Sequence, residues 1–242
     1  MLDIHVENYN YNKIEPVIKK IQVKLKKGEI TSIIGASGCG KSTLLRVLMG
    51  MENGASGFIR TENQEFMLEK WGEKQNLFTL VPQIPHLLPW KNILENIAFV
   101  VTNIQVEKEK KSKREIALEA LKLVQLDQHA MKYPNEISLG MAQRISFARA
   151  LVMNSEAILL DEPFASLDAH SKHFFQQWLF QKITQTNKYA ILVTHDVREA
   201  LNLSKDIHVI GEKPAIIKKS FKNIINENEY LTEFEREIIS YI

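Results

Sequence analysis

The sequence predicts an α/β fold built around a mainly parallel β-sheet. Four short runs rich in β-branched residues are spread along the chain, and three of them are almost continuously apolar. Strands covered on both faces, as in a parallel sheet, show this pattern. Segments with helical periodicity lie between the runs, and this alternation is typical of α/β proteins. The predicted strands are Ile30–Ile34, Leu77–Val81, Ala157–Leu160 and Ala190–Thr194.

Helical periodicity fills the intervals between these runs, and one predicted helix is clearly amphipathic. The stretch Glu115–Leu126 places four apolar residues on one face, which we expect to pack against the core. Two further helices are predicted, one directly after the first strand and one before the third. Their ranges are Lys41–Met49 and Gln143–Met153, and the apolar face of the amphipathic helix consists of Ile116, Ala120, Leu121 and Val124.

The end of the chain predicts a strand and then a helix, beginning near Ile216. Its apolar residues are expected to pack on the core rather than to form a separate regulatory domain. A charge run at Lys108–Arg114 is expected to be a solvated helix end or loop, as most such runs are. The apolar residues of the predicted C-terminal helix are Leu231, Phe234 and Ile238.

Composition limits the class of protein. The chain has 242 residues, 45% of them apolar and 25% charged, which suits one full-sized globular domain. A net charge of only +2 disfavours a nucleic-acid partner. The single cysteine, Cys39, excludes an internal disulfide and favours a reducing, cytoplasmic location. We recognise neither a signal peptide nor an apolar run of about 18 residues, so a membrane role would require a spanning partner.

A phosphate-binding loop is predicted at residues 35–42, which read Gly-Ala-Ser-Gly-Cys-Gly-Lys-Ser and match G-x-x-x-x-G-K-[ST]. Glycines let backbone N–H groups approach a triphosphate, and the following helix presents its positive N-terminus. Lys41 would reach the β and γ oxygens, and the Ser42 hydroxyl would ligate Mg²⁺. ATP and Mg²⁺ are therefore the expected ligands. The expected nucleotide-binding residues are Gly35, Ala36, Ser37, Gly38, Cys39, Gly40, Lys41, Ser42 and Thr43, with Cys39 lending only its backbone N–H.

Polar residues follow three other predicted strands. Asp161 can hold Mg²⁺ through its water shell, and Glu162 can take a proton from an attacking water. Gln83 can ligate Mg²⁺ and orient that water, while His195 can hydrogen-bond the γ-phosphate. Each of these residues alone is weak evidence for a site, but parallel strands bring their carboxyl ends together at one edge of the sheet. The expected catalytic residues are Glu162, His195, Gln83 and Lys41, and the expected Mg²⁺ ligands are Ser42, Gln83 and Asp161.

With these motifs in place, the chain from about residue 3 to about residue 215 resembles the ATP-binding cassette (ABC) family. Ile137–Arg144 resembles its L-S-G-G-Q signature, and Ser138 stands 23 residues before Asp161 (161 − 138). Ser166, Leu167 and Asp168 resemble its D-loop. The resemblance implies a single ATPase domain. It has a RecA-like P-loop NTPase core with a small antiparallel β subdomain (about 1–84 and 156–215), an inserted helical subdomain (about 85–155) and a C-terminal tail (216–242).

The resemblance also implies that one subunit holds only half of a catalytic site. Tyr11 stands where the family stacks an aromatic ring on adenine, although Tyr9 is close enough to compete. The signature of a second copy, or of a paralogous subunit, would complete the site. Leu139 replaces a glycine of the signature, and its side chain could crowd the opposing nucleotide, so we expect slower or more conditional hydrolysis. The residues expected to act across the dimer are Ser138, Gly140, Met141 and Asp168.

A further stretch, Pro82–Trp90, resembles import ATPases for nitrate, sulfonates and taurine. The apolar residues Leu87–Trp90 would form a surface that receives a short helix of a membrane permease, near residues 83–98. Alternatively, Trp90 lies in the core of the helical subdomain. The expected function is ATP hydrolysis that energises an importer, peripherally at the cytoplasmic face, with a substrate-binding protein as an indirect partner. An exporter or lipoprotein-release ATPase, and a weakly hydrolysing regulatory subunit, remain alternatives.

Overall fold

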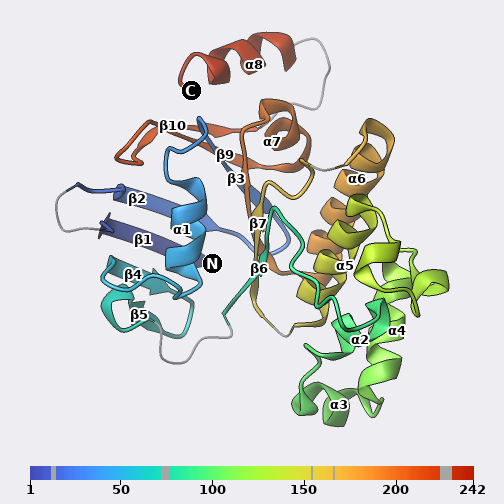
Figure 1. Ribbon diagram of the computed structural model, residues 1–242. Coiled ribbons are helices and arrows are strands. Elements are labelled where there is room, and N and C mark those ends of the chain that lie inside the picture. The colour runs from blue at the N-terminus through green and yellow to red at the C-terminus, as the bar shows by residue number, and fades with distance from the viewer. Residues whose placement is uncertain (12–14, 72–76, 154, 166, 224–230) are drawn as a thin grey trace.

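The computed structural model describes residues 1–11, 15–71, 77–153, 155–165, 167–223 and 231–242 (Figure 1). At residue 170 and at residues 231–234 the backbone alone is described. Ser166 of the predicted D-loop lies outside the described residues, as do the side chains of Leu231 and Phe234 in the predicted C-terminal helix. None of the helices in the described part of the chain combines the length and apolar composition that a membrane span requires.

The larger sheet has six strands in the order β10-β9-β3-β8-β7-β6. The pairs β6·β7, β7·β8, β3·β8 and β3·β9 are parallel, and β10 pairs with β9 in the antiparallel sense. The four predicted strands are therefore adjacent and parallel, and the α/β prediction is confirmed. The strands are β3 (Ile30–Ile34), β6 (Phe78–Val81), β7 (Ala157–Asp161), β8 (Tyr189–Thr194), β9 (Asp206–Ile210) and β10 (Ile217–Lys222).

Helices and a second sheet cover both faces of this sheet, which explains why its central strands β3, β7 and β8 are almost entirely buried. On one face, α1 (Lys41–Leu48) packs in a buried cluster shared with the small sheet. On the other face, α5 (Leu139–Val152) and α6 (Ala169–Thr186) bury an aromatic group against β7 and β8. The aromatic residues of that group are Phe147, Phe164 and Phe175.

The second sheet is antiparallel and has the strand order β2-β1-β4-β5, as the family resemblance implied. Its β2 strand alternates buried and exposed residues along most of its length, the pattern of a sheet with one face in water. This sheet lies beside α1 in Figure 1. Its strands are β1 (Leu2–Tyr9), β2 (Ile18–Leu25), β4 (Ser56–Arg60) and β5 (Glu65–Met67).

A helical region lies beside the larger sheet (Figure 1) and is built from capped helices. Asn92, Thr102 and Ser112 each form a capping box with the residue three positions later, so the sequence itself sets where α2, α3 and α4 begin. The predicted apolar face of α4 is buried. The charge run covers the end of α3, the connection to α4 and the start of α4, in largely exposed positions. The helices are α2 (Ile93–Ala98), α3 (Asn103–Glu109) and α4 (Lys113–Leu123).

The predicted strand and helix at the chain end are also present. They are β10 and α8 (Leu231–Ile239), and Ile238 of α8 is fully buried beside α7 (Val197–Leu203) and β9. Short 3-10 turns complete the described elements at Leu68–Lys70, Asp127–His129 and Pro134–Glu136.

Candidate functional site

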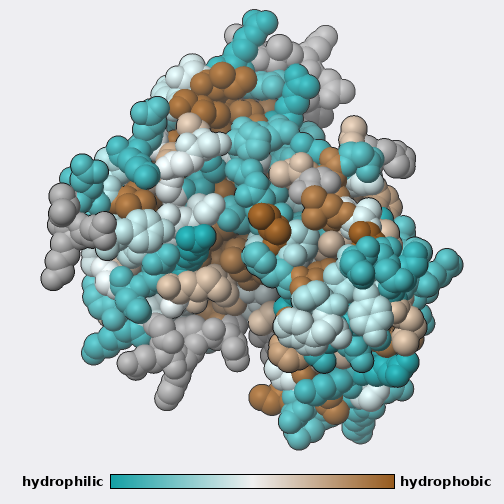
Figure 2. Space-filling view, viewed as in Figure 1, coloured by the Kyte–Doolittle hydropathy of each residue, from teal (hydrophilic) through white to brown (hydrophobic). Residues whose placement is uncertain are grey.

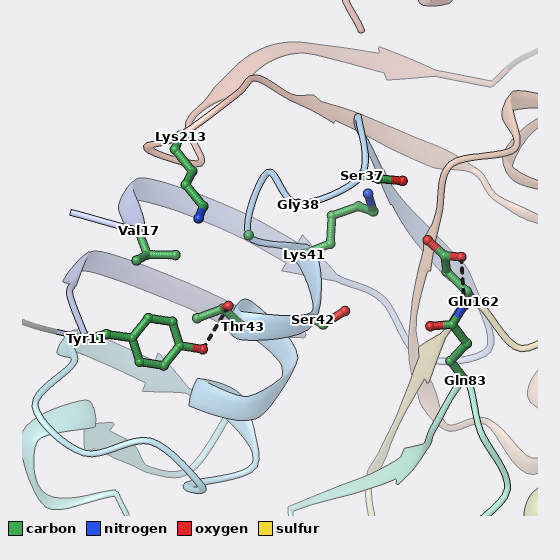
Figure 3. Close-up of a pocket in the computed structure, with 11 residues that line it drawn as sticks. Tyr11, Val17, Ser37, Gly38, Lys41, Ser42, Thr43, Gln83, Glu162 and Lys213 are labelled. Atoms are coloured by element: carbon green, nitrogen blue, oxygen red, sulfur yellow. Dashed lines mark hydrogen bonds between the residues drawn. The ribbon is translucent and has the colours of Figure 1, made fainter. Parts of the chain in front are cut away.

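A cavity of about 310 Å³ opens where β3, β6 and β7 end (Figure 3). Most of its lining comes from residues that the sequence predicted, although they lie far apart along the chain. One end of the cavity carries Tyr11 and Val17, and the other end carries Gln83 and Glu162. The lining residues between these ends include Ser37, Gly38, Gly40, Lys41, Ser42 and Thr43.

The glycine-rich turn joins β3 to α1 and needs glycine for two different reasons. Gly40, the N-cap of α1, has φ 115°, which side chains of L residues rarely tolerate. A Cβ on Gly35 would lie 2.7 Å from the backbone oxygen of Ile210 in β9. The sequence predicted that position 35 requires glycine to make room for phosphate. In the structure, the requirement comes from close packing against β9.

Lys41 is buried at the start of α1 and turns back into the glycine-rich turn. Its Nζ donates to the backbone oxygens of Gly35 at 2.7 Å and of Ala36 at 2.8 Å. Cys39 is also buried, and its Sγ lies 3.9 Å from Nζ. The ammonium group therefore lies against the glycine-rich turn, where a polyanion bound at the start of α1 would also reach it.

Oxygen groups that suit Mg²⁺ lie next to this lysine. The Ser42 hydroxyl donates to Oδ1 of Asp161 at 3.1 Å. Burial raises the pKa of Asp161 above its usual value, although the hydrogen bond from Ser42 acts in the opposite direction. In the described residues, no group of three or more His, Cys, Asp or Glu side chains could hold a metal ion. These residues fit Mg²⁺, which accepts few protein ligands and keeps waters and phosphate oxygens.

Glu162 is the point at which the remaining predicted side chains meet. Its Oε2 lies 3.1 Å from Nδ1 of His195 and accepts a hydrogen bond from Nε2 of Gln83 at 3.4 Å. The backbone of Glu162 has φ 43°, and its N–H donates to Val193 of β8 at 2.9 Å. A non-glycine residue held in this conformation by a neighbouring strand has its side chain aimed by the backbone.

The two candidate adenine-binding tyrosines differ sharply in environment. Tyr9 is only 2% exposed, and its hydroxyl donates to Glu52 at 2.7 Å. Burial, with that hydrogen bond, raises the pKa of Tyr9 above its ordinary value. Tyr11 is 51% exposed, lines the cavity, and has its hydroxyl 3.1 Å from Oγ1 of Thr43. The geometry favours Tyr11, because a buried ring cannot stack on a ligand.

The signature residues do not line this cavity. Ser138 is the exposed N-cap of α5, and its Oγ accepts the N–H of Met141 at 3.2 Å. Leu139, the first residue of α5, is 53% exposed. A Cβ on Gly140 would meet the Leu167 side chain at 3.1 Å, and Asp168 caps α6 by accepting the N–H of Ser171. The residues predicted to act across the dimer (Ser138, Gly140, Met141 and Asp168) therefore lie outside the cavity.

Two residues that line the cavity, Val17 and Lys213, were not predicted from the sequence. Lys213 extends toward the cavity from the connection between β9 and β10 (Figure 3). Backbone hydrogen bonds of Ala215 hold this connection to the start of β2, at 2.8 Å to Val17 and 3.0 Å from Lys19. No sequence signal marks either residue, because neither belongs to a motif and their proximity depends on pairing between distant segments.

A buried lysine in a glycine-rich turn, with paired carboxylates at the same edge of a parallel sheet, defines a nucleotide-binding protein of the P-loop ATPase class. The ABC transporter family model matches residues 18–165. The chain belongs to the ABC transporter family. The prediction that it is an ATP-binding ATPase subunit is thereby confirmed.

The curated relatives are import ATP-binding proteins. The chain is 37% identical over 207 residues to the aliphatic sulfonates import ATP-binding protein SsuB of Bacillus cereus, covering 86% of this chain and 78% of that protein. It is 38% identical over 198 residues to the nitrate import ATP-binding protein NrtC of Synechococcus elongatus, covering 82% of this chain. The match spans only 29% of the length of the nitrate protein.

Solved structures show the same architecture. An ATP-binding cassette solved as a dimer in a post-hydrolysis state, bound to ADP and Pi, has a TM-score of 0.76 at 27% identity. The match covers 92% of this chain and 99% of that one. The cbiO1 protein from Clostridium perfringens, part of the complex cbiONQ, has a TM-score of 0.80 at 25% identity, covering 99% and 92%.

Replacement of Tyr11 by Ala should weaken ATP binding about tenfold or more, since base–aromatic stacking contributes roughly 1–3 kcal/mol. Fluorescent-nucleotide titration of the isolated protein measures this. Tyr9→Phe is the matched control, because it removes the buried hydroxyl of the other candidate tyrosine, at the end of β1. This variant should bind ATP within about twofold of the parent. Equal weakening in both variants would contradict the assignment.

Replacement of Leu139 by Gly should raise the ATPase turnover, because it removes a side chain that would crowd the opposing nucleotide. Leu139→Ala keeps a Cβ and should fall between the parent and the glycine variant. Phosphate release at saturating ATP measures the effect. A rate for Leu139→Gly that is unchanged or lower than that of the parent would show that the leucine does not restrain hydrolysis.

Proposed function

We propose that this chain hydrolyses ATP in the cavity beside Lys41 and thereby energises import of a small solute through a membrane permease. The observation that carries the proposal is the meeting of Lys41, Ser42, Asp161 and Glu162 at one sheet edge. The buried ammonium would exchange its two carbonyl partners for β and γ oxygens. Hydrogen bonds from the ammonium to charged phosphate oxygens are stronger than its bonds to neutral carbonyl oxygens.

Hydrolysis needs a nucleophile aligned with the γ-phosphorus and a place for its proton. Glu162 would take that proton, so that the water oxygen bonds to phosphorus as the bond to the ADP oxygen breaks. His195 would turn its ring from Glu162 toward the γ-phosphate, and Gln83 would orient the water. Mg²⁺ bound by Ser42, Asp161 and Gln83 would supply neutralisation of the charge on the phosphates.

A second copy of the chain would complete the site. Ser138 is exposed and lies outside the cavity, at the start of a 14-residue helix whose first N–H groups suit an anion. The dimeric cassette bound to ADP and Pi has the same fold. We propose a homodimer in which Ser138, Gly140 and Met141 of one copy face the γ-phosphate of the other, with Asp168 at the same interface.

The permease would dock beside Gln83. A groove of about 560 Å³ lies between the end of α1, the segment after β6 and α5, and Met49, Met51, Ile84 and Met153 line it. The same groove reaches Ser42, Gln83 and Asp161 of the nucleotide side. Figure 2, in the same view as Figure 1, shows apolar surface near the middle of the molecule, between the part that holds the small sheet and the part that holds the helical region. Such a groove suits a short amphipathic helix.

Trp90 follows Ile84 of this groove by six residues along the chain (90 − 84). It is 71% exposed, so the alternative that it belongs to the core of the helical region is wrong. Its turn is nevertheless rigid, because the fully buried Asn96 accepts the N–H of Leu88 at 2.8 Å and donates to the oxygens of Leu88 and Lys91. An exposed ring held on a braced turn is typical of an interface anchor.

The relatives support the import direction and a place at the membrane. The two relatives described above are import proteins for nitrate and for aliphatic sulfonates, which are both oxyanions. We propose nitrate, a sulfonate or taurine as the class of cargo, chosen by a substrate-binding protein and permease, with this subunit on the cytoplasmic face. In this scheme residues 85–155 act as the helical subdomain, residues 1–84 and 156–215 as the nucleotide-binding core, and 216–242 as a tail.

Leu139 supports a second candidate, a subunit that binds ATP and hydrolyses it weakly. Both candidates require a nucleotide-dependent dimer. They differ in the rate of phosphate release by purified protein.

Glu162→Gln should lower phosphate release by a factor of about 10² or more, because loss of a general base typically costs 10²–10⁴. The same variant should still bind ATP and should accumulate as a dimer on size-exclusion chromatography with MgATP. Glu156→Gln, exposed just before the opposite end of β7, is the matched control and should hydrolyse at the parental rate. Negligible release by the parent would favour the regulatory candidate.

Trp90→Ala should weaken binding to the permease in detergent roughly 30-fold, since a buried aromatic anchor at an interface contributes about 2 kcal/mol or more. Biolayer interferometry with the immobilised permease measures this. Ile104→Ala, on exposed α3 outside the proposed surface, is the control. Comparable losses in both variants would argue against docking through Trp90.

A further inference from the structure

The loop that carries His195 is enclosed by a ring of polar contacts on both of its sides. Thr194 precedes His195, and its hydroxyl donates to Oε2 of Glu199 at 2.6 Å. Asp196 follows His195, and its N–H donates to Oγ1 of Thr194 at 3.0 Å. The carboxylate of Asp196 also caps α7 by accepting the N–H groups of Arg198 and Glu199.

A single lysine from another helix joins the two carboxylates of this ring. The Nζ of Lys172 lies 2.8 Å from Oδ2 of Asp196 and 2.7 Å from Oε1 of Glu199. The side chain of Glu199 is 5% exposed and that of Lys172 is 29% exposed, so solvent screens this pair less than a surface pair. Burial alone would lower the pKa of Lys172, but its hydrogen bonds to Asp196 and Glu199 outweigh burial and raise it.

His195 is the residue that this ring leaves free to act. Its side chain is 58% exposed and reaches Glu162, whereas the side chains on either side of it point into the ring. A ring that fixes residues 194 and 196 also fixes the Cα–Cβ direction of residue 195. Since a shift of about 1 Å in a catalytic group can cost about 10²-fold in rate, that direction matters for turnover.

We propose that Lys172 is a positioning residue for His195, holding the loop so that the imidazole faces the γ-phosphate side of the cavity. This inference rests on the proposed function, because it concerns the orientation of a group that acts in hydrolysis. Lys172 stands in the first turn of α6, whose N-cap is Asp168. The helix that follows the predicted cross-dimer residue therefore also sets the direction of the catalytic histidine.

The test compares three variants with a control on the same helix. Lys172→Met removes the charge, Lys172→Arg keeps it, and the double variant Lys172→Met with Glu199→Gln also removes the buried carboxylate that would otherwise remain unpaired. Leaving such a charge unpaired is strongly destabilising, so the double variant serves if Lys172→Met fails to fold. Lys182→Met is the control, because the hydrogen bond described for the Lys182 side chain goes to Gln185 of the same helix.

The two variants without the lysine should lower kcat about tenfold or more while KM for ATP changes less than about twofold, because a transition-state contact is lost rather than uniform binding. Lys172→Arg should retain kcat within about threefold, and Lys182→Met should match the parent. Hydrogen exchange of the segment 194–199, measured without nucleotide, should become faster in the double variant.

A double-mutant cycle separates positioning from a general structural role. In a His195→Ala background, the loss of Lys172 should lower kcat by less than about twofold, because the group that it positions is already gone. Full additivity of the two losses, or unchanged exchange at 194–199, would overturn the inference. A parental ATPase rate in His195→Ala alone would instead contradict the role given to His195 in the proposed function.

Discussion

The arrangement of the whole site depends on the register of four parallel strands. Ile34 of β3 pairs with Thr194 of β8, and Val193 of β8 pairs with Asp161 of β7. Because these strands end within about one residue of each other, the residues that follow them leave the sheet at one edge. Every residue of β3 and β8 is buried, so sliding one strand along another would misplace packed side chains on both faces. The chemistry of the edge is therefore fixed by packing far from it.

The same packing shapes the nucleotide side of the cavity. Gly35 lies against the backbone of Ile210, and Lys41 at the start of α1 donates to two carbonyl groups of the turn. Ser42 and Asp161 are already hydrogen-bonded to each other. A preformed site loses less conformational entropy on binding than a disordered loop would, so more of the contact energy remains for affinity.

The sequence predicted what short-range patterns encode. Apolar runs gave the four central strands, and a spaced motif gave Lys41 and its neighbours. The sequence did not separate Tyr9 from Tyr11. Tyr9 is the buried last residue of β1, whereas Tyr11 lies beyond the end of that strand, beside Thr43, 32 residues further along the chain. Lys172 and Lys213 were missed for a related reason. The partners of Lys172 lie 24 and 27 residues further along the chain (199 − 172 = 27 for Glu199), and no local pattern records such a pairing.

Leu139 shows how one residue can affect both binding and turnover in a shared site. A leucine that is 53% exposed at a helix start gains free energy when another surface covers it, at about 25 cal/mol per Å² of apolar area. Burial between two copies would thus favour the closed dimer. The same isobutyl group, however, would stand between the first N–H groups of α5 and the opposing phosphate, where a glycine would not. In the proposed dimer, leucine at this position would therefore add apolar burial between the copies while hindering the contacts of α5 with the phosphate that a glycine would allow.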